Sequence, residues 1–117
     1  MLSRVESNAT FPSSVNVLSV DPTSPESLAA ALRGQDAVVS AIGRDGLLGQ
    51  SVLFDAAIAA GVERLLPSEF GCDLPNANTA TLPVFGYNIA TRNYIEGKVK
   101  EGADITYTYV VTGAFLD

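Results

Sequence analysis

Short apolar runs alternate along the chain with longer segments that carry apolar residues at helical spacing. Most of the runs are rich in β-branched residues and end at a glycine, a proline or a polar turn, as buried strands do. Strands are therefore predicted at residues 15–20, 36–43, 65–66 and 106–111. Strand and helix alternate between residues 15 and 66, and this order predicts a right-handed parallel βαβ array.

Three segments are predicted to be helices. Ser24 can cap the first one, and Gly34 can end it in the left-handed conformation. The second helix, at residues 50–60, is apolar on nearly every face, which predicts burial between the sheet and a covering layer. Gly61 is the expected end of this helix. The third helix is expected at residues 84–101.

The segment Arg64–Gly71, R-L-L-P-S-E-F-G, changes from an apolar run to a polar corner. Pro67 removes a donor from the sheet ladder. Ser68 supplies a hydroxyl, Glu69 a carboxylate and Gly71 a permissive backbone. Functional groups of open α/β sheets lie just past the carboxyl ends of strands, so this corner is expected at the functional site. The loop that follows, residues 72–83, is expected to cover a ligand.

The corner, the helix after it and the run T-Y-T-Y-V-V-T-G-A-F at Thr106–Phe115 resemble the NmrA-like and isoflavone-reductase-like family. The resemblance covers residues 1–117. That family comprises atypical short-chain dehydrogenase-type proteins with an NADPH-binding Rossmann domain and a small substrate domain. The resemblance therefore implies an α/β fold, here a partial Rossmann-like, doubly wound parallel sheet with flanking helices, and NADP(H) as the cofactor.

The resemblance also implies roles for residues at two strand ends. Arg4 would contact the 2′-phosphate of NADPH, where a planar fork of donors suits the ligand. By spacing alone, Arg4 would be an ordinary exposed arginine. Asp21 would lie near the adenine, and it can equally start a turn with the residues that follow.

Two further groups of candidates follow from the strand ends. Small residues at the end of the strand at 36–43 would let the backbone approach the ribose and phosphates, although a plain core strand with an ordinary turn fits this composition equally well. In the family the nicotinamide would lie over the corner. The candidate cofactor-binding residues are thus Arg4, Asp21, Ser40, Ala41, Ile42, Gly43, Pro67, Ser68 and Phe70.

Asn88 is a departure from the pattern of the family's enzymes. The resemblance places a lysine on the helix after P-S-E-F-G, four residues before an arginine. Here Arg92 matches the arginine, so Asn88 occupies the lysine position and is the candidate catalytic residue. An amide cannot take up or give a proton near neutral pH, so we expect Asn88 to orient a ligand rather than deprotonate it.

Composition excludes several classes of function. The net charge is −6, with 7 basic residues and no basic cluster, which argues against a nucleic-acid partner. The absence of histidine excludes Ser-His-Asp and Cys-His catalysis within the chain and the commonest zinc ligand, so no metal is expected. The single cysteine, Cys72, is expected to be an inert thiol. No leader-like opening or bilayer-length apolar run occurs, so a cytoplasmic, membrane-free location is expected.

No glycine-rich turn of the G-x-G-x-x-G type is present in the sequence. The chain is therefore expected to be a partial NAD(P)-binding domain whose first strand, glycine loop and substrate domain lie outside residues 1–117. In the strand order 3-2-1-4-5-6 the first strand is central. The resemblance makes residues 1–4 the tail of the second strand. Either the chain is marginally stable, or this strand pairs with the strand at 36–43 and closes the sheet over the gap.

Three functions stay open on this evidence. The chain could belong to an NADPH-dependent reductase that acts on a small aromatic or carbonyl substrate. It could instead be a non-catalytic NAD(P)-sensing regulator that presents the complex to a protein partner. Finally, it could be a segment that is inactive on its own.

Overall fold

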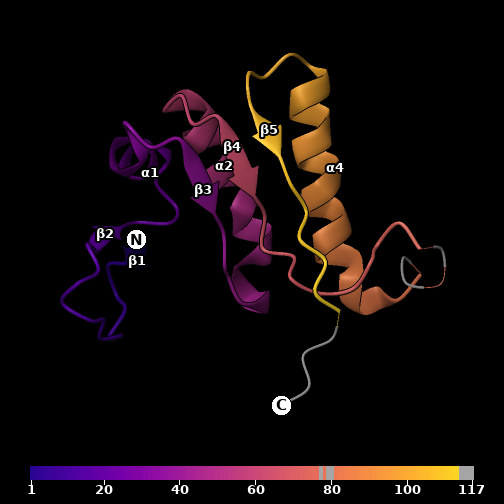
Figure 1. Ribbon diagram of the computed structural model, residues 1–117, viewed down its shortest axis with the longest axis horizontal. Helices are drawn as coiled ribbons and strands as arrows, with labels where there is room; N and C mark the ends of the chain where they lie inside the picture. Colours follow the sequence, from indigo (N-terminus) through magenta and orange to yellow (C-terminus); the bar gives the residue numbers. More distant parts are fainter. Residues whose placement is uncertain (77, 79–80, 114–117) are drawn as a thin grey trace.

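The structure is a computed structural model that describes residues 1–76, 78 and 81–113. Within these residues the chain is an α/β fold whose short parallel strands form two separate sheets flanked by helices (Figure 1). The two-stranded sheet pairs β1 (Leu2–Arg4) with β2 (Leu18–Val20). The three-stranded sheet has the order β3 (Ala37–Val39), β4 (Arg64–Leu66) and β5 (Thr106–Tyr107).

Every strand pair is parallel, as the alternation of strand and helix predicted. The strands are shorter than the apolar runs, and the corner explains this in the three-stranded sheet. Backbone groups of successive residues point to alternate neighbours, so Pro67, which has no N–H group, ends the ladder with β5. On the β3 side the next donor is the Ser68 N–H, which donates to Gln50 Oε1 instead. The last bonds are from Ser40 N–H to the Leu66 carbonyl and from Thr108 N–H to the Leu65 carbonyl, both 2.9 Å.

The helices begin and end close to the predicted positions. They are α1 (Pro25–Leu32), α2 (Gln50–Ala59) and α4 (Gly86–Lys100). The Ser24 hydroxyl accepts the Ser27 N–H at 3.2 Å and so caps α1 as predicted. Gly34 and Gly61 take the left-handed conformation expected of them, with φ of +76° and +80°. None of the helices described here is long and apolar enough to span a bilayer.

Two short 3₁₀ turns were not predicted. They are η1 (Arg44–Gly49), which leads directly into α2, and η2 (Pro83–Phe85), which leads into α4. The loop that was expected to cover a ligand includes residues 77, 79 and 80, and the family motif at the end of the chain includes residues 114 and 115. These positions lie outside the described residues.

The two sheets do not join through the described strands. β1 pairs with β2 and β3 pairs with β4, and no ladder runs between β1 and β3. The expectation that these two strands would close the sheet is therefore wrong. Instead, α1 connects the two sheets, because it packs against β2 on one side and α2 on the other. The interruption falls where the order 3-2-1-4 has its first strand.

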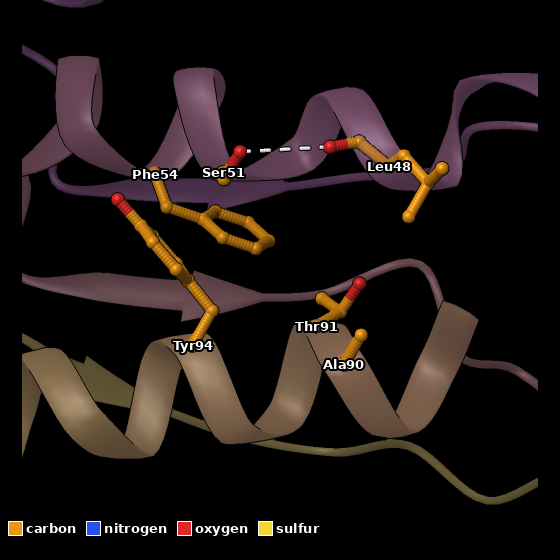
Figure 2. Close-up of a pocket in the computed structure, with 6 residues that line it drawn as sticks. All are labelled: Leu48, Ser51, Phe54, Ala90, Thr91 and Tyr94. Atoms are coloured by element: carbon orange, nitrogen blue, oxygen red, sulfur yellow. Dashed lines mark hydrogen bonds between the residues drawn. The ribbon is translucent and has the colours of Figure 1, made fainter. Parts of the chain in front are cut away.

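The hydrophobic core lies between the sheets and the helices. Phe54, Ala57, Leu65 and Ile95 are each 2% exposed or less. Figure 2 shows α2 and α4 side by side, with strands passing behind both. Successive residues of a strand point to opposite faces. The helices cover one face of the three-stranded sheet, and Val39, 61% exposed, lies on the other.

Candidate functional site

The corner after β4 is a buried junction of several segments, and Ser68 is its centre. The Ser68 N–H donates to Gln50 Oε1 at 2.9 Å. The Ser68 hydroxyl donates to the Ile42 carbonyl at 2.8 Å and accepts the Ile42 N–H at 2.9 Å. The Ser68 carbonyl accepts a bond from Asn88 Nδ2 at 3.4 Å. One serine thus connects the end of β3, the start of α2 and the first turn of α4.

This arrangement gives Ser68 a structural task that its sequence did not indicate. Its hydroxyl was expected to face a cofactor, but both of its hydrogen bonds go to the Ile42 backbone, and the residue is only 8% exposed. Pro67 is buried as well, whereas Phe70 is half-buried. The cofactor contacts of these three residues remain predictions.

The segment after β3 lies directly beside the corner, as the parallel sheet requires. Ala41, Ile42 and Gly43 are exposed, and two bonds hold Ile42 to Ser68. Ser40 is 3% exposed, and its hydroxyl has no hydrogen-bond partner in the described part of the chain. The structure therefore brings Ser40–Gly43 together with Pro67–Phe70 at the carboxyl ends of β3 and β4.

Arg4 and Asp21 form a second group, at the end of the two-stranded sheet. Arg4 is exposed and pairs in register with Val20, so Asp21 follows directly beside it. The Asp21 carboxylate accepts bonds from the Thr23 hydroxyl at 2.7 Å and the Thr23 N–H at 2.8 Å. These bonds lower the pKa of the Asp21 carboxyl. Asp21 thus starts the turn that its sequence context suggested. Its position near an adenine stays a prediction.

No hydrogen bond among the described residues joins the two groups. They share one property, because each lies at the carboxyl end of a parallel strand. In doubly wound folds ligands bind in the crevice outside those ends. The geometry therefore fits a ligand that is long enough to contact both sheets.

Two contacts at the corner were missed by sequence reasoning. Gln50 is 1% exposed, and while its Oε1 accepts the Ser68 N–H, its Nε2 has no partner within the described residues. A polar residue at the start of an otherwise apolar helix was the available signal. Arg92, used above only to locate Asn88, forms an ion pair with Glu69 of the corner.

A small apolar pocket lies elsewhere, between α2 and α4. Figure 2 shows side chains from both helices and η1 around it. Its volume is about 170 Å³, and it is lined by Leu48, Ser51, Phe54, Ala90, Thr91 and Tyr94. Ligand pockets usually hold roughly 300–1,000 Å³, so this one is too small for a dinucleotide. On an ideal helix Ala90 and Tyr94 face away from the side that carries Asn88 and Arg92.

Comparison with known proteins agrees with the fold. The model of the NmrA-like family matches residues 3–117. Oxidoreductase aprR of Aspergillus flavus is 36% identical over 120 residues, which cover 100% of this chain and 40% of aprR. Isoflavone reductase homolog P3 of Arabidopsis thaliana is 38% identical over 104 residues, which cover 86% of this chain and 32% of that protein.

Solved structures show the same relationship. The match to the crystal structures of pinoresinol-lariciresinol and phenylcoumaran benzylic ether reductases has a TM-score of 0.78 at 28% identity, covering 97% of this chain and 41% of the other. AtPrR2, solved with NADP+ and (+)pinoresinol, matches with a TM-score of 0.70 at 31% identity, covering 85% and 33%. These relatives are oxidoreductases and isoflavone-reductase-like proteins, and the chain spans about two fifths of their length or less. Because the family model matches residues 3–117, the chain belongs to the NmrA-like family.

Proposed function

We propose that the natural protein containing this chain is an NADP(H)-dependent oxidoreductase that acts on a small aromatic or carbonyl-type substrate. The observation that carries the proposal is the junction at Ser68, which joins two strand ends and α4 beside the exposed residues 41–43. The presence of NADP+ and (+)pinoresinol in the AtPrR2 structure supports the cofactor and the substrate class.

The two groups of strand-end residues would hold opposite ends of the cofactor. Arg4 would bind the 2′-phosphate and Asp21 would lie near the adenine. The exposed residues 41–43 would lie under the ribose and phosphates. The corner, with Pro67, Ser68 and Phe70, would carry the nicotinamide, which supplies the hydride when bound.

Asn88 would orient the substrate or the nicotinamide at the corner. It is half-buried, and its amide already reaches the Ser68 carbonyl. A neutral amide can hold a ligand through hydrogen bonds but cannot remove a proton from it. Any proton transfer in the reaction would therefore involve another group or water.

The experiment follows NADPH absorbance in the presence of aromatic ketones and quinones, with Asn88→Ala and Asn93→Ala compared with the unchanged protein. Asn93 lies on the same helix and is exposed, which makes it the matched control. We expect Asn88→Ala to lower turnover by roughly tenfold, the order expected when one positioning hydrogen bond is lost, and Asn93→Ala to leave it unchanged. Equal turnover in all three proteins would remove Asn88 from the mechanism.

One observation favours a second function, a regulator that binds NAD(P) without turnover. The residue at the position of the family's catalytic lysine is the amide Asn88, which cannot take up or give a proton near neutral pH, and the Glu69 carboxylate of the corner is already paired with Arg92. Equal affinity for the oxidised and reduced cofactor, with no NADPH consumption on any substrate, would support the regulator. Steady oxidation of NADPH would exclude it.

A further inference from the structure

Glu69 and Arg92 form a buried ion pair with two contact points beside the corner. Arg92 Nε donates to Glu69 Oε1 at 2.8 Å, and an Arg92 terminal nitrogen donates to Glu69 Oε2. The two side chains are only 3% and 10% exposed. Because this pairing uses the planar fork of the guanidinium, a lysine would keep the charge but lose the geometry.

A tyrosine ring supports the same guanidinium. The Arg92 Cζ lies 4.1 Å from the centre of the Tyr109 ring, which is within the range of a cation–π contact. The Tyr109 hydroxyl donates to Glu96 Oε1 at 2.8 Å. Burial, followed by the bond to Glu96, raises the pKa of Tyr109, so the hydroxyl stays protonated. Arg92 is thus fixed by Glu69 and by an aromatic ring that is itself anchored.

The backbone next to the ion pair has a conformation that needs support. Phe70 has φ of +41°, a left-handed value that residues with a side chain rarely adopt. On its far side, the Gly71 carbonyl accepts bonds from the N–H groups of Thr112 at 3.1 Å and Gly113 at 3.0 Å. Phe70 is therefore held between an ion pair on one neighbour and two hydrogen bonds on the other.

Helix α4 meets the corner through two side chains on one face. Asn88 and Arg92 are four residues apart, so they lie one above the other on the helix. Asn88 reaches the Ser68 carbonyl, and Arg92 reaches the side chain of the next residue, Glu69. The ion pair thus holds α4 against the corner one helical turn away from Asn88.

We propose that Arg92 is a positioning residue that acts through Glu69. It sets the backbone conformation at Phe70 and the approach of Asn88 to Ser68, and through them the geometry of the nicotinamide end of the site. Arg92 needs no contact of its own with the cofactor. This inference rests on the proposed function, since it assigns the corner to the nicotinamide.

The test compares Arg92→Lys with Arg33→Lys in the natural protein containing these residues. Arg33 is exposed at the end of α1 and serves as the matched control. Each protein is titrated with NADPH and with adenosine 2′,5′-bisphosphate, which has the 2′-phosphate and adenine but no nicotinamide. We expect Arg92→Lys to weaken NADPH binding on the order of tenfold, the usual cost of losing a charge-assisted hydrogen bond, and to leave bisphosphate binding unchanged.

If Arg92 had only a structural role, Arg92→Lys would weaken the binding of both ligands to the same extent, and this outcome would overturn the proposal. An unchanged affinity for NADPH would overturn it as well. If the unchanged protein binds neither ligand, the proposed function fails and the inference fails with it. If it binds both, and Arg92→Lys keeps the same ratio of affinities, the inference alone fails. Should Arg92→Lys not fold, Glu69→Gln breaks the same pair from its other side, and the ratio of affinities is again the measurement.

Discussion

At the scale of single residues, Ser68 is notable because its N–H, hydroxyl and carbonyl are all hydrogen-bonded to protein groups. All four of these bonds cross between segments that are 18 or more residues apart in sequence. A buried polar group that loses its partner costs free energy, so each of these partners stabilises the corner. The buried amide of Gln50 is the most enclosed of them.

Replacing Gln50 with leucine should therefore destabilise the chain. The substitution keeps the approximate side-chain volume but leaves the Ser68 N–H buried without an acceptor, which costs about 1–3 kcal/mol. Urea denaturation measures the change in the free energy of unfolding. Gln35→Leu is the control, because Gln35 is exposed and its side chain has no hydrogen bond among the described residues. A Gln50→Leu variant as stable as the Gln35→Leu variant would contradict this account.

At the scale of elements, helix ends were predictable from the sequence and strand ends were not. Ser24, Gly34 and Gly61 act on their own neighbours in the chain, so their signals are local and the structure confirms them. A strand ends where its partner strand stops offering hydrogen bonds. The ladder with β5 stops at Pro67, and the ladder with β3 stops because the Ser68 N–H donates to Gln50. No pattern within residues 36–43 or 106–111 contains that information.

Contacts between segments distant in sequence, which leave no local signal, also limited the prediction of the site. The carboxyl ends of the strands followed from the alternation of elements, and Arg4, Asp21 and the corner were expected there for that reason. The pairing of Arg92 with Glu69 joins residues 23 positions apart, and it depends on how α4 is oriented against the sheet. Helical spacing within α4 put Asn88 and Arg92 on one face but could not say what that face meets.

The cap of α1 can be tested at this scale. Ser24→Ala removes the acceptor for the Ser27 N–H and should lower the free energy of unfolding by about 1 kcal/mol. Because α1 packs against both β2 and α2, this loss should shift the midpoint of the helical signal to a lower denaturant concentration. Chemical denaturation followed by circular dichroism measures it. Ser14→Ala, at an exposed position before β2, should have no effect, and a similar loss there would show that the cap is unimportant.

At the scale of the whole molecule, the interrupted sheet is the main feature. β1 and β3 each have a partner on one side among the described residues, and Val39 is exposed on the uncovered face. Strands of parallel sheets are normally buried on both faces, so these residues contribute less stabilisation than their composition would allow.

The 117-residue chain on its own should therefore unfold at low temperature and over a broad range. Thermal melting followed by circular dichroism at 222 nm is the measurement, and repeating it near 280 nm tests whether secondary and tertiary structure are lost together. We expect the two signals to diverge, because the two-stranded sheet is attached mainly through α1. A single sharp transition at high temperature, seen equally by both signals, would contradict this view.

The single-helix bridge between the sheets also bears on how a long ligand would bind. α1 is the main contact between the two-stranded sheet and the rest of the chain, and no ladder among the described strands fixes the two sheets relative to each other. A dinucleotide bound at both ends would provide a second connection and would lose affinity to the entropy of stiffening the protein. A mononucleotide that binds at one sheet alone would not have this entropic cost. The binding free energy of the whole dinucleotide should therefore be less favourable than the binding free energies of its two mononucleotide parts would suggest.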